Sequence, residues 1–342
     1  VPAGRDSTGA VPGIIRWVTL ICTLYNEAGT VGEFLDAIFT MDPGPEEFII
    51  LDGGSTDGTN AAIAGYLSRR KTPMEVRHLI RPECNRKFTV GAIARGRNEA
   101  ISAAGHALIA VTDGGCAVSK NWLKEIIRPL TDGSGAEVAG GWYVGDARSA
   151  FERCIAGVWL IPPGAVDPRN FMPSSRSIAF RKSAWEAVGG YPERTYYAED
   201  TMFNLALRRK GYSFAYVPGA IVRWRMKSTP GSFVRLVHDY GFGDGENRIM
   251  AGNLLSTAVK LGGAVALMAA ALLVHPAWVV VLFAFWTLLV ARRGIDGNNL
   301  TSFLRDLPCS ILVKLLADVS YLTGHLGGRL TGAPAASGER AS

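Results

Sequence analysis

Short apolar runs alternate with helix-like segments through roughly the first 115 residues of this 342-residue chain. The runs that favour β-strands are VTLICTL at 18–24, EFIILD at 47–52, EVRHLI at 75–80 and ALIAVTD at 107–113. Helical patterns of about 10–15 residues separate them, which is typical of βαβ units. The sequence therefore predicts an α/β fold with a Rossmann-like, mostly parallel sheet.

Acidic residues stand where three of these strands end. Glu27 follows the first strand, Asp52 ends the second, and Asp113 ends the run of the fourth. The carboxyl ends of parallel strands meet at one edge of a sheet, where ligands bind. A single acid there could simply cap a helix, which explains Asp57 well. Three acids at one edge instead indicate a common site for a ribose, a base edge or a metal.

Composition excludes several other classes of protein. The net charge of +6 suits phosphorylated ligands or an anionic membrane surface, yet no basic run is interleaved with aromatic residues, so no nucleic-acid partner is predicted. Five cysteines without a CxxC pair disfavour a zinc site or a disulfide framework. Neither a GxGxxG fingerprint nor a Walker lysine follows the first strands.

A looser pattern of strands and helices follows from about residue 137 and is expected to complete one pocket. EVAGGWYV and SRSIAF resemble strands, and YAEDTMFNLALRRKG resembles a helix that ends at Gly211. Glu199 and Asp200 lie at the start of this helix, after an aromatic stretch. They are either catalytic acids or an acidic N-terminal cap.

The last third of the chain changes character. Two nearly uncharged stretches, 254–274 and 277–290, flank His275–Pro276 and predict a membrane hairpin; a buried soluble hairpin is the alternative. A third stretch, 308–323, carries Lys314 and Asp318 and is interpreted as an amphipathic helix.

These observations predict four parts. Residues 1–16 form a flexible extension without the apolar core of a signal peptide, and 17–235 form the catalytic domain. Residues 236–330 contain the glycine-rich 238–248 segment, expected as a loop over the pocket or a linker, then the hairpin and the amphipathic helix. Residues 331–342 form a disordered tail.

Five motifs in order resemble glycosyltransferase family 2 over about residues 17–250: TLYNEAGTVGEFLDAI, ILDGGSTDGT, ARGRNEAI, VTDGGCAVSKNWL and AEDTMFNLALRRKGY. The resemblance implies a GT-A fold and an enzyme that inverts the anomeric centre of a nucleotide-sugar. The residues it implies are Tyr25, Glu27 and Asp52 for the nucleoside, Arg97 near the nucleotide, Asp113 as the first acid of the DxD motif, and Asp200 as catalytic base with Glu199 beside it.

The chain departs from that family pattern in two places. The DxD position has the sequence Asp113-Gly114-Gly115, so a Mg²⁺ or Mn²⁺ ion would have Asp113 but no second acid there. The QxxRW motif of processive synthases is also missing, which favours transfer of a single sugar.

The expected protein is a glycosyltransferase of the cytoplasmic membrane, with its catalytic domain facing the cytoplasm because Arg292 and Arg293 follow the hairpin. A UDP-sugar is one candidate donor, and the acceptor would be a lipid-linked or membrane-proximal glycan. Three alternatives stay open at this point: a processive synthase, a non-catalytic nucleotide-sugar-binding protein and a nucleotidyltransferase.

Overall fold

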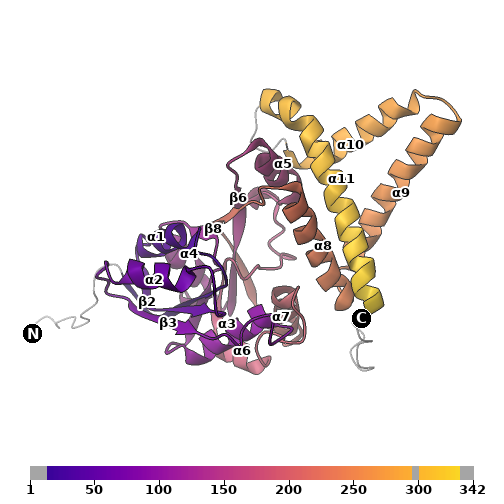
Figure 1. Cartoon of the computed structure of the whole chain (residues 1–342). Coiled ribbons are helices and arrows are strands. Elements are labelled where there is room, and N and C mark those ends of the chain that lie inside the picture. Colours follow the sequence, from indigo (N-terminus) through magenta and orange to yellow (C-terminus); the bar gives the residue numbers. More distant parts are fainter. Residues whose placement is uncertain (1–13, 295–299, 332–342) are drawn as a thin grey trace, which may run out of the picture. The chain divides into compact units, whose positions relative to one another are not determined.

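A computed structural model describes residues 14–294 and 300–331 (Figure 1). The flexible extension predicted for 1–16 lies almost wholly outside the described residues, as does the tail predicted for 331–342. The chain divides into two compact units, which are described separately. The α/β unit contains the chain up to 143, 167–194 and 199–223, and the helical unit contains 144–166, 195–198 and the chain from 224 onward.

The boundary predicted at residue 235 stays a prediction, and the division into compact units follows other positions. The chain leaves the α/β unit after Tyr143 and again after Arg194, before its final exit after Arg223. The reason is packing: helix α5 (Ala150–Trp159) makes its helix contacts with α10 (Trp278–Gly294) and α11 (Leu300–Thr331), so this insertion belongs with the C-terminal helices.

One eight-stranded sheet has the order β3-β2-β1-β4-β7-β6-β8-β5. Its strands are β1 (Ile14–Leu24), β2 (Gly44–Asp52), β3 (Glu75–Ile80), β4 (Leu108–Val111), β5 (Cys116–Val118), β6 (Val138–Asp146), β7 (Ile178–Arg181) and β8 (Phe214–Arg225), of which β6 and β8 end in the helical unit. Strands β1 to β4 pair in parallel, whereas β7 pairs antiparallel with β4 and β6. The predicted mostly parallel α/β sheet is confirmed.

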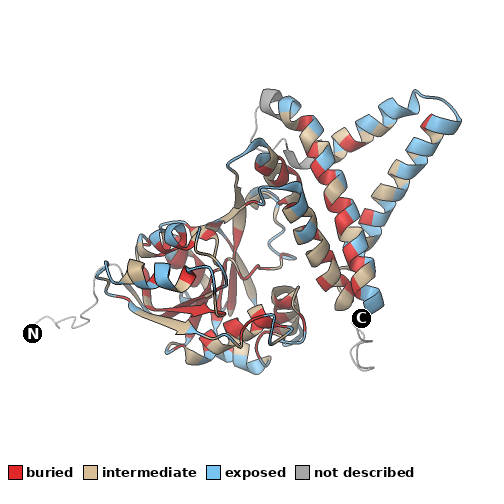
Figure 2. Ribbon diagram, viewed as in Figure 1, coloured by how far each residue is buried: buried red, intermediate tan, exposed pale blue. Residues whose placement is uncertain are grey.

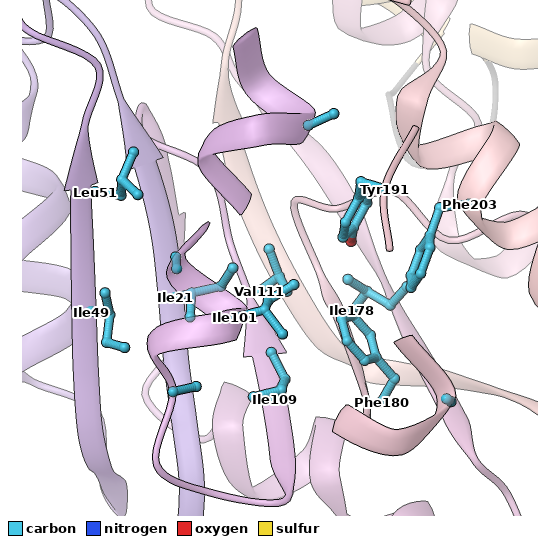
Figure 3. Close-up of a cluster of buried hydrophobic side chains, with 14 of the residues drawn as sticks. Ile21, Ile49, Leu51, Ile101, Ile109, Val111, Ile178, Phe180, Tyr191 and Phe203 are labelled. Atoms are coloured by element: carbon cyan, nitrogen blue, oxygen red, sulfur yellow. The ribbon is translucent and has the colours of Figure 1, made fainter. Parts of the chain in front are cut away.

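The helices of the α/β unit accompany this sheet, and some of them bury a clear apolar stripe. The helices are α1 (Val31–Phe39), α2 (Thr59–Leu67), α3 (Ala92–Ala103), α4 (Trp122–Thr131), α6 (Lys182–Ala187) and α7 (Glu199–Arg209). In α1 the buried residues are Val31, Phe34, Leu35 and Ile38, the spacing of one helix face. The core joins strand residues such as Ile21 and Ile49 to Phe203 of α7 (Figure 3).

The helical unit consists of α5, α8 (Pro230–Glu246), α9 (Ala251–Leu273), α10 and α11, with α8 lying along α11 (Figure 1). The prediction of a loop at 238–248 is therefore wrong, because most of this segment is helical. Gly241 and Gly245 of α8 lie so close to α11 that a Cβ there would collide with the carbonyl oxygens of Tyr321 and His325. These glycines allow two helix backbones to touch, as small residues do in closely packed helix pairs.

Two helices are long and apolar enough to cross a membrane: α9 and the Leu304–Thr331 part of α11. The first was predicted as a membrane segment. The third stretch, predicted as amphipathic, passes the same test, whereas the apolar part of α10, Trp278–Ala291, is shorter. Most residues of α9 and α10 are exposed (Figure 2), with Leu272 at 78%. Such exposure of large apolar side chains is unlike the core hairpin of a soluble protein.

Candidate active site

The segments that follow β1 and β2 are joined by hydrogen bonds at the carboxyl edge of the sheet. Backbone N–H groups after β1 donate to side chains of the loop after β2, and one bond runs the other way. The pairs are Asn26 N to Ser55 Oγ (2.8 Å), Glu27 N to Thr59 Oγ1 (2.8 Å), Ala28 N to Asp57 Oδ2 (3.0 Å) and Thr56 N to Asn26 Oδ1 (2.9 Å). These hydrogen bonds hold the segments after β1 and β2 together. Asp57 has a structural role here, because it accepts one of these bonds.

Asp52, predicted to hold the nucleoside, is fully buried at the end of β2. Its Oδ1 accepts hydrogen bonds from the backbone N–H of Gly54 (2.8 Å) and Ser55 (2.7 Å) and from Asn60 Nδ2 (3.2 Å). Its Oδ2 accepts from the hydroxyl of Ser55 at 2.6 Å. Asp52 thus fixes the loop after β2. The same hydrogen bonds offset the free-energy cost of burying its carboxylate.

Tyr25 and Glu27 follow β1 directly. Tyr25 is 45% exposed. Glu27 Oε2 accepts a hydrogen bond from the Thr30 hydroxyl, and a Cβ built at Gly115 would lie 4.0 Å from the same oxygen. The ends of β1 and β4 therefore meet, as predicted from the parallel sheet.

The two glycines after Asp113 have structural causes. A Cβ at Gly114 would collide with the side chain of Leu24, and Gly115 has φ +74°, a conformation that side chains disfavour. An acid at Gly115 would therefore strain this turn. This positive φ is a structural reason for glycine at the position of the second acid of the DxD motif.

Arg97 of α3 lies between two acids from distant parts of the sequence. Its side chain is 3% exposed; Nη2 lies 2.7 Å from Asp113 Oδ1, and Nη1 lies 2.7 Å from Glu199 Oε1. The guanidinium is also 5.4 Å from the centre of the Tyr191 ring. Arg97 thus links the end of β4 to the first turn of α7.

The two acids respond to this buried cation in opposite ways. Burial alone would raise the pKa of Asp113, but the charges of Arg97 and Arg176 bring it below its ordinary value. For Glu199 burial prevails over Arg97, and with the negative charge of Asp200 nearby the pKa rises to about 7. Asp113 therefore keeps its negative charge at neutral pH. Glu199, by contrast, changes its protonation state near pH 7.

Asp200 is the more accessible of the two acids that begin α7. Its Oδ1 accepts a hydrogen bond from the backbone N–H of Thr201 at 2.8 Å. Its Oδ2 has only long contacts, 3.4 Å to Ser174 Oγ and 3.5 Å to Ser175 N. Asp200 therefore has the chemistry of a carboxylate that can accept a proton from a bound hydroxyl.

Arg176 was not singled out from the sequence. It precedes β7, its charge acts on Asp113, and its guanidinium lies 5.5 Å from the centre of the Tyr143 ring. Nη1 also donates to Ser174 Oγ at 2.9 Å. The signal that could have found it is the polar run SSRS (174–177) entering an apolar strand.

The donor set for a divalent cation is small. Among the described residues, His, Cys, Asp and Glu side chains form no group of three or more suited to a metal ion. Asp113 and Glu27 are the acids at the meeting strand ends, and the ion pair with Arg97 uses only Oδ1 of Asp113. Hard carboxylate oxygens in this number suit an ion that receives its remaining ligands from a diphosphate.

The mostly parallel sheet, continued by antiparallel strands, has the Rossmann-like arrangement of the GT-A fold. The sequence model of "Glycosyl transferase family 2" matches residues 19–176, and that of "Glycosyl transferase family group 2" matches 118–315. The chain belongs to glycosyltransferase family 2 and is a glycosyltransferase.

Individual proteins agree with that assignment. The O-antigen chain rhamnosyltransferase WbaN of Salmonella anatum is 28% identical over 239 residues, which cover 65% of this chain and 70% of that protein. The glycosyltransferase AglE of Haloferax volcanii is 25% identical over 212 residues, which cover 60% of this chain and 66% of that protein.

A solved structure has the same fold. It is the mannosyltransferase PcManGT from Pyrobaculum calidifontis in complex with GDP-Man and Mn²⁺. The TM-score is 0.53 at 16% identity, with 92% of this chain and 87% of that chain covered.

Proposed function

We propose that this enzyme transfers one sugar from a nucleotide-sugar to a hydroxyl of a lipid-linked or membrane-proximal glycan, with inversion at the anomeric carbon. The observation that carries the proposal is the chain of contacts from Asp113 through Arg97 to Glu199, the residue beside Asp200. This chain fixes a proton-accepting carboxylate relative to the strand end where a diphosphate would bind.

In this proposal Asp200 accepts the proton of the acceptor hydroxyl. The hydroxyl oxygen then bonds to the anomeric carbon from the face opposite the leaving group, while the bond from that carbon to the diphosphate breaks. Glu199 does not touch the reacting atoms; held by Arg97, it positions the first turn of α7. The strand-end residues Tyr25, Glu27 and Asp52 form and shape the nucleoside side of the site.

Negative charge grows on the diphosphate as the sugar leaves and must be neutralised. Arg176 is one cation of this chain close enough to Asp113 to act there. A divalent ion, Mg²⁺ or Mn²⁺, would be held by Asp113 with Glu27 close by, and when bound it supplies further positive charge to the diphosphate oxygens. The Mn²⁺ in the similar mannosyltransferase supports this assignment.

The acceptor and the location are inferred from relatives and from the helices. The similar WbaN enzyme acts on an O-antigen chain, by its name, which supports a bacterial envelope glycan as acceptor. The exposed apolar side chains of α9 and α10 support attachment to a membrane. Arg292 and Arg293, which follow the apolar part of α10 in the sequence, favour a catalytic unit on the cytoplasmic side.

Donor turnover tests the proposal. Purified full-length protein in detergent would be incubated with UDP-, GDP- and dTDP-sugars, Mn²⁺ or Mg²⁺, and a membrane lipid extract. Release of nucleoside diphosphate should require both the lipid extract and Asp200, and Asp200→Asn should lower the rate by about 10²–10⁴-fold. Asp167→Asn, an exposed acid of the same unit, serves as the matched control.

The other readings give different results in this assay. Donor binding without release, equal in wild type and Asp200→Asn, would replace the transferase by a nucleotide-sugar-binding protein. A ladder of extended products would show a processive synthase. Release of pyrophosphate instead of nucleoside diphosphate would show a nucleotidyltransferase.

A further inference from the structure

The helical unit contains a cavity of about 300 Å³ with a mixed polar and apolar lining. Its charged residues are Lys260 of α9 and Lys314 and Asp318 of α11. Tyr321 adds a polar group, while Trp159 and Ala317 are part of the apolar wall. This volume lies at the lower end of the range of small-molecule sites.

The charges in this cavity are organised around one carboxylate. Lys314 and Asp318 are 7% and 6% exposed and form a buried ion pair one helical turn apart. The ammonium group of Lys260 lies 3.9 Å from the other oxygen of Asp318. Two lysines of the lining therefore surround one aspartate of the lining.

A second carboxylate, that of Asp244, lies just outside the lining. The hydroxyl of Tyr321 donates to Asp244 Oδ2 of α8 at 2.7 Å. Asp244 is not part of the lining. Lys260, with 24% side-chain exposure, is the less deeply buried of the two lysines and is only weakly held at 3.9 Å. Lys260 is thus the group best placed to turn toward an incoming anion.

The position of these residues in the sequence makes the arrangement costly without a ligand. Lys260 is in α9, and Lys314 and Asp318 are in α11, the two helices long and apolar enough to cross a membrane. Ionisable residues in such helices are expensive and usually mark a pathway or a binding site. A lining that combines lysines with Trp159 and aliphatic side chains suits an amphiphile with an anionic head.

We propose that this cavity binds the phosphate or diphosphate head of a lipid, with Lys260 and Lys314 as the phosphate ligands and Trp159 against the first carbons of the chain. The site lies wholly within the helical unit, and none of its residues was assigned to sugar transfer. The inference rests on the proposed function only in naming a lipid-linked glycan acceptor as one source of that phosphate. An anionic phospholipid of the membrane is the other source.

Native mass spectrometry of the full-length protein, released from detergent with phosphatidylcholine as background lipid, tests the proposal. The probes are a polyprenyl diphosphate, the uncharged polyprenol and phosphatidylglycerol. The polyprenyl diphosphate should bind with one-to-one stoichiometry at least tenfold more tightly than the polyprenol. Lys260→Met should weaken this binding by about tenfold, because one charged contact to phosphate is lost.

Lys227→Met is the matched control, because it removes the same charge from an exposed position of the helical unit outside the cavity. A double variant, Lys314→Met with Asp318→Leu, removes both members of the buried pair, and Lys260, which is 24% exposed, loses only its 3.9 Å contact with Asp318. It should lose phosphate binding while keeping a cooperative unfolding transition. Should it fail to fold, Lys260→Met alone decides the outcome.

Binding of polyprenyl diphosphate that depends on Lys260 would support the proposal with the acceptor as source. Equal, Lys260-dependent binding of phosphatidylglycerol would support it with a membrane phospholipid as source. Equal binding of diphosphate and polyprenol, or equal effects of Lys260→Met and Lys227→Met, would overturn it. Donor release that needs Asp200, without lipid binding at Lys260, would overturn this inference and leave the proposed transferase intact.

Discussion

Each of the two units contains a cluster of charged side chains, and the arrangement of charge in one is the opposite of that in the other. In the α/β unit one cation, Arg97, lies between the carboxylates of Asp113 and Glu199. In the helical unit one carboxylate, Asp318, lies between the ammonium groups of Lys260 and Lys314. The first cluster places two acids around one cation, with Arg176 and Asp200 also acting on these acids. The second places two cations around one acid, and Asp244 is bonded to the neighbouring Tyr321.

The two units also achieve close packing by opposite means. The core of the α/β unit interlocks large side chains; for example, the Phe203 and Tyr191 rings stack with their centres 4.1 Å apart. In the helical unit, α8 and α11 meet through glycines, so their backbones touch. A core of large side chains is sensitive to truncation, whereas a glycine contact is sensitive to added atoms.

The largest expected effect is on the cation that holds the acidic cluster. Arg97→Met should lower the free energy of unfolding by about 3–5 kcal/mol, because the buried Glu199 and the partly buried Asp113 lose their shared partner. Urea unfolding followed by tryptophan fluorescence would measure it. Arg95→Met is the control: Arg95 is on the same helix, is 36% exposed and pairs with Glu99 at the surface, so its loss should cost under about 1 kcal/mol. Equal losses in the two variants would show that Arg97 is no organising centre.

The glycine contact should be nearly as sensitive. Gly245→Ala should destabilise the helical unit by about 1–3 kcal/mol, because the new methyl group collides with the His325 carbonyl. Gly262→Ala in α9 is the matched control, since nothing lies within 4 Å of its added Cβ. That variant should be neutral or up to about 1 kcal/mol more stable, as alanine favours helix. Thermal unfolding compares the two, and a harmless Gly245→Ala would contradict the close contact of α8 and α11.

The sequence predicted part of this architecture for clear physical reasons. Strand periodicity gave the parallel strands, and parallel strands necessarily bring Glu27 and Asp113 to one edge. The link from Arg97 to Glu199 spans 102 residues, and no local pattern encodes it. The low helix propensity of the glycines in 238–248 predicts a loop. In the structure most of this segment belongs to α8, where its glycines pack against α11.

The acidic cluster should make stability depend on pH near neutrality. The pKa of Glu199 is raised by burial to about 7, above the ordinary value of 4.5, so the folded protein holds this proton more tightly. The corresponding stability is full below about pH 4.5 and is lost as the pH rises through about 7. Wild type should therefore lose on the order of 1–3 kcal/mol more than Glu199→Gln between pH 5 and pH 8.

Chemical unfolding of both proteins at these two pH values would measure that difference. The lowered pKa of Asp113 acts below its ordinary value of 3.8, outside this window. Histidines such as His78 are common to both proteins, so their effect largely cancels. Parallel stability curves for wild type and Glu199→Gln would mean that Glu199 stays ionised throughout and that Arg97 prevails over burial.

The smallest expected effect tests why the acidic cluster needs a cation from another element. Arg97 is committed to its two carboxylates, so Arg176 is the residue expected to meet the donor diphosphate. Arg176→Met should raise KM for the nucleotide-sugar by about tenfold, the equivalent of ~1.4 kcal/mol, with little change in the free energy of unfolding. Arg169→Met, at an exposed position of the same unit, should leave KM unchanged. If Arg176→Met lowered stability as Arg97→Met does and left KM alone, Arg176 would belong to the fold, and the acidic cluster would meet the diphosphate through other groups.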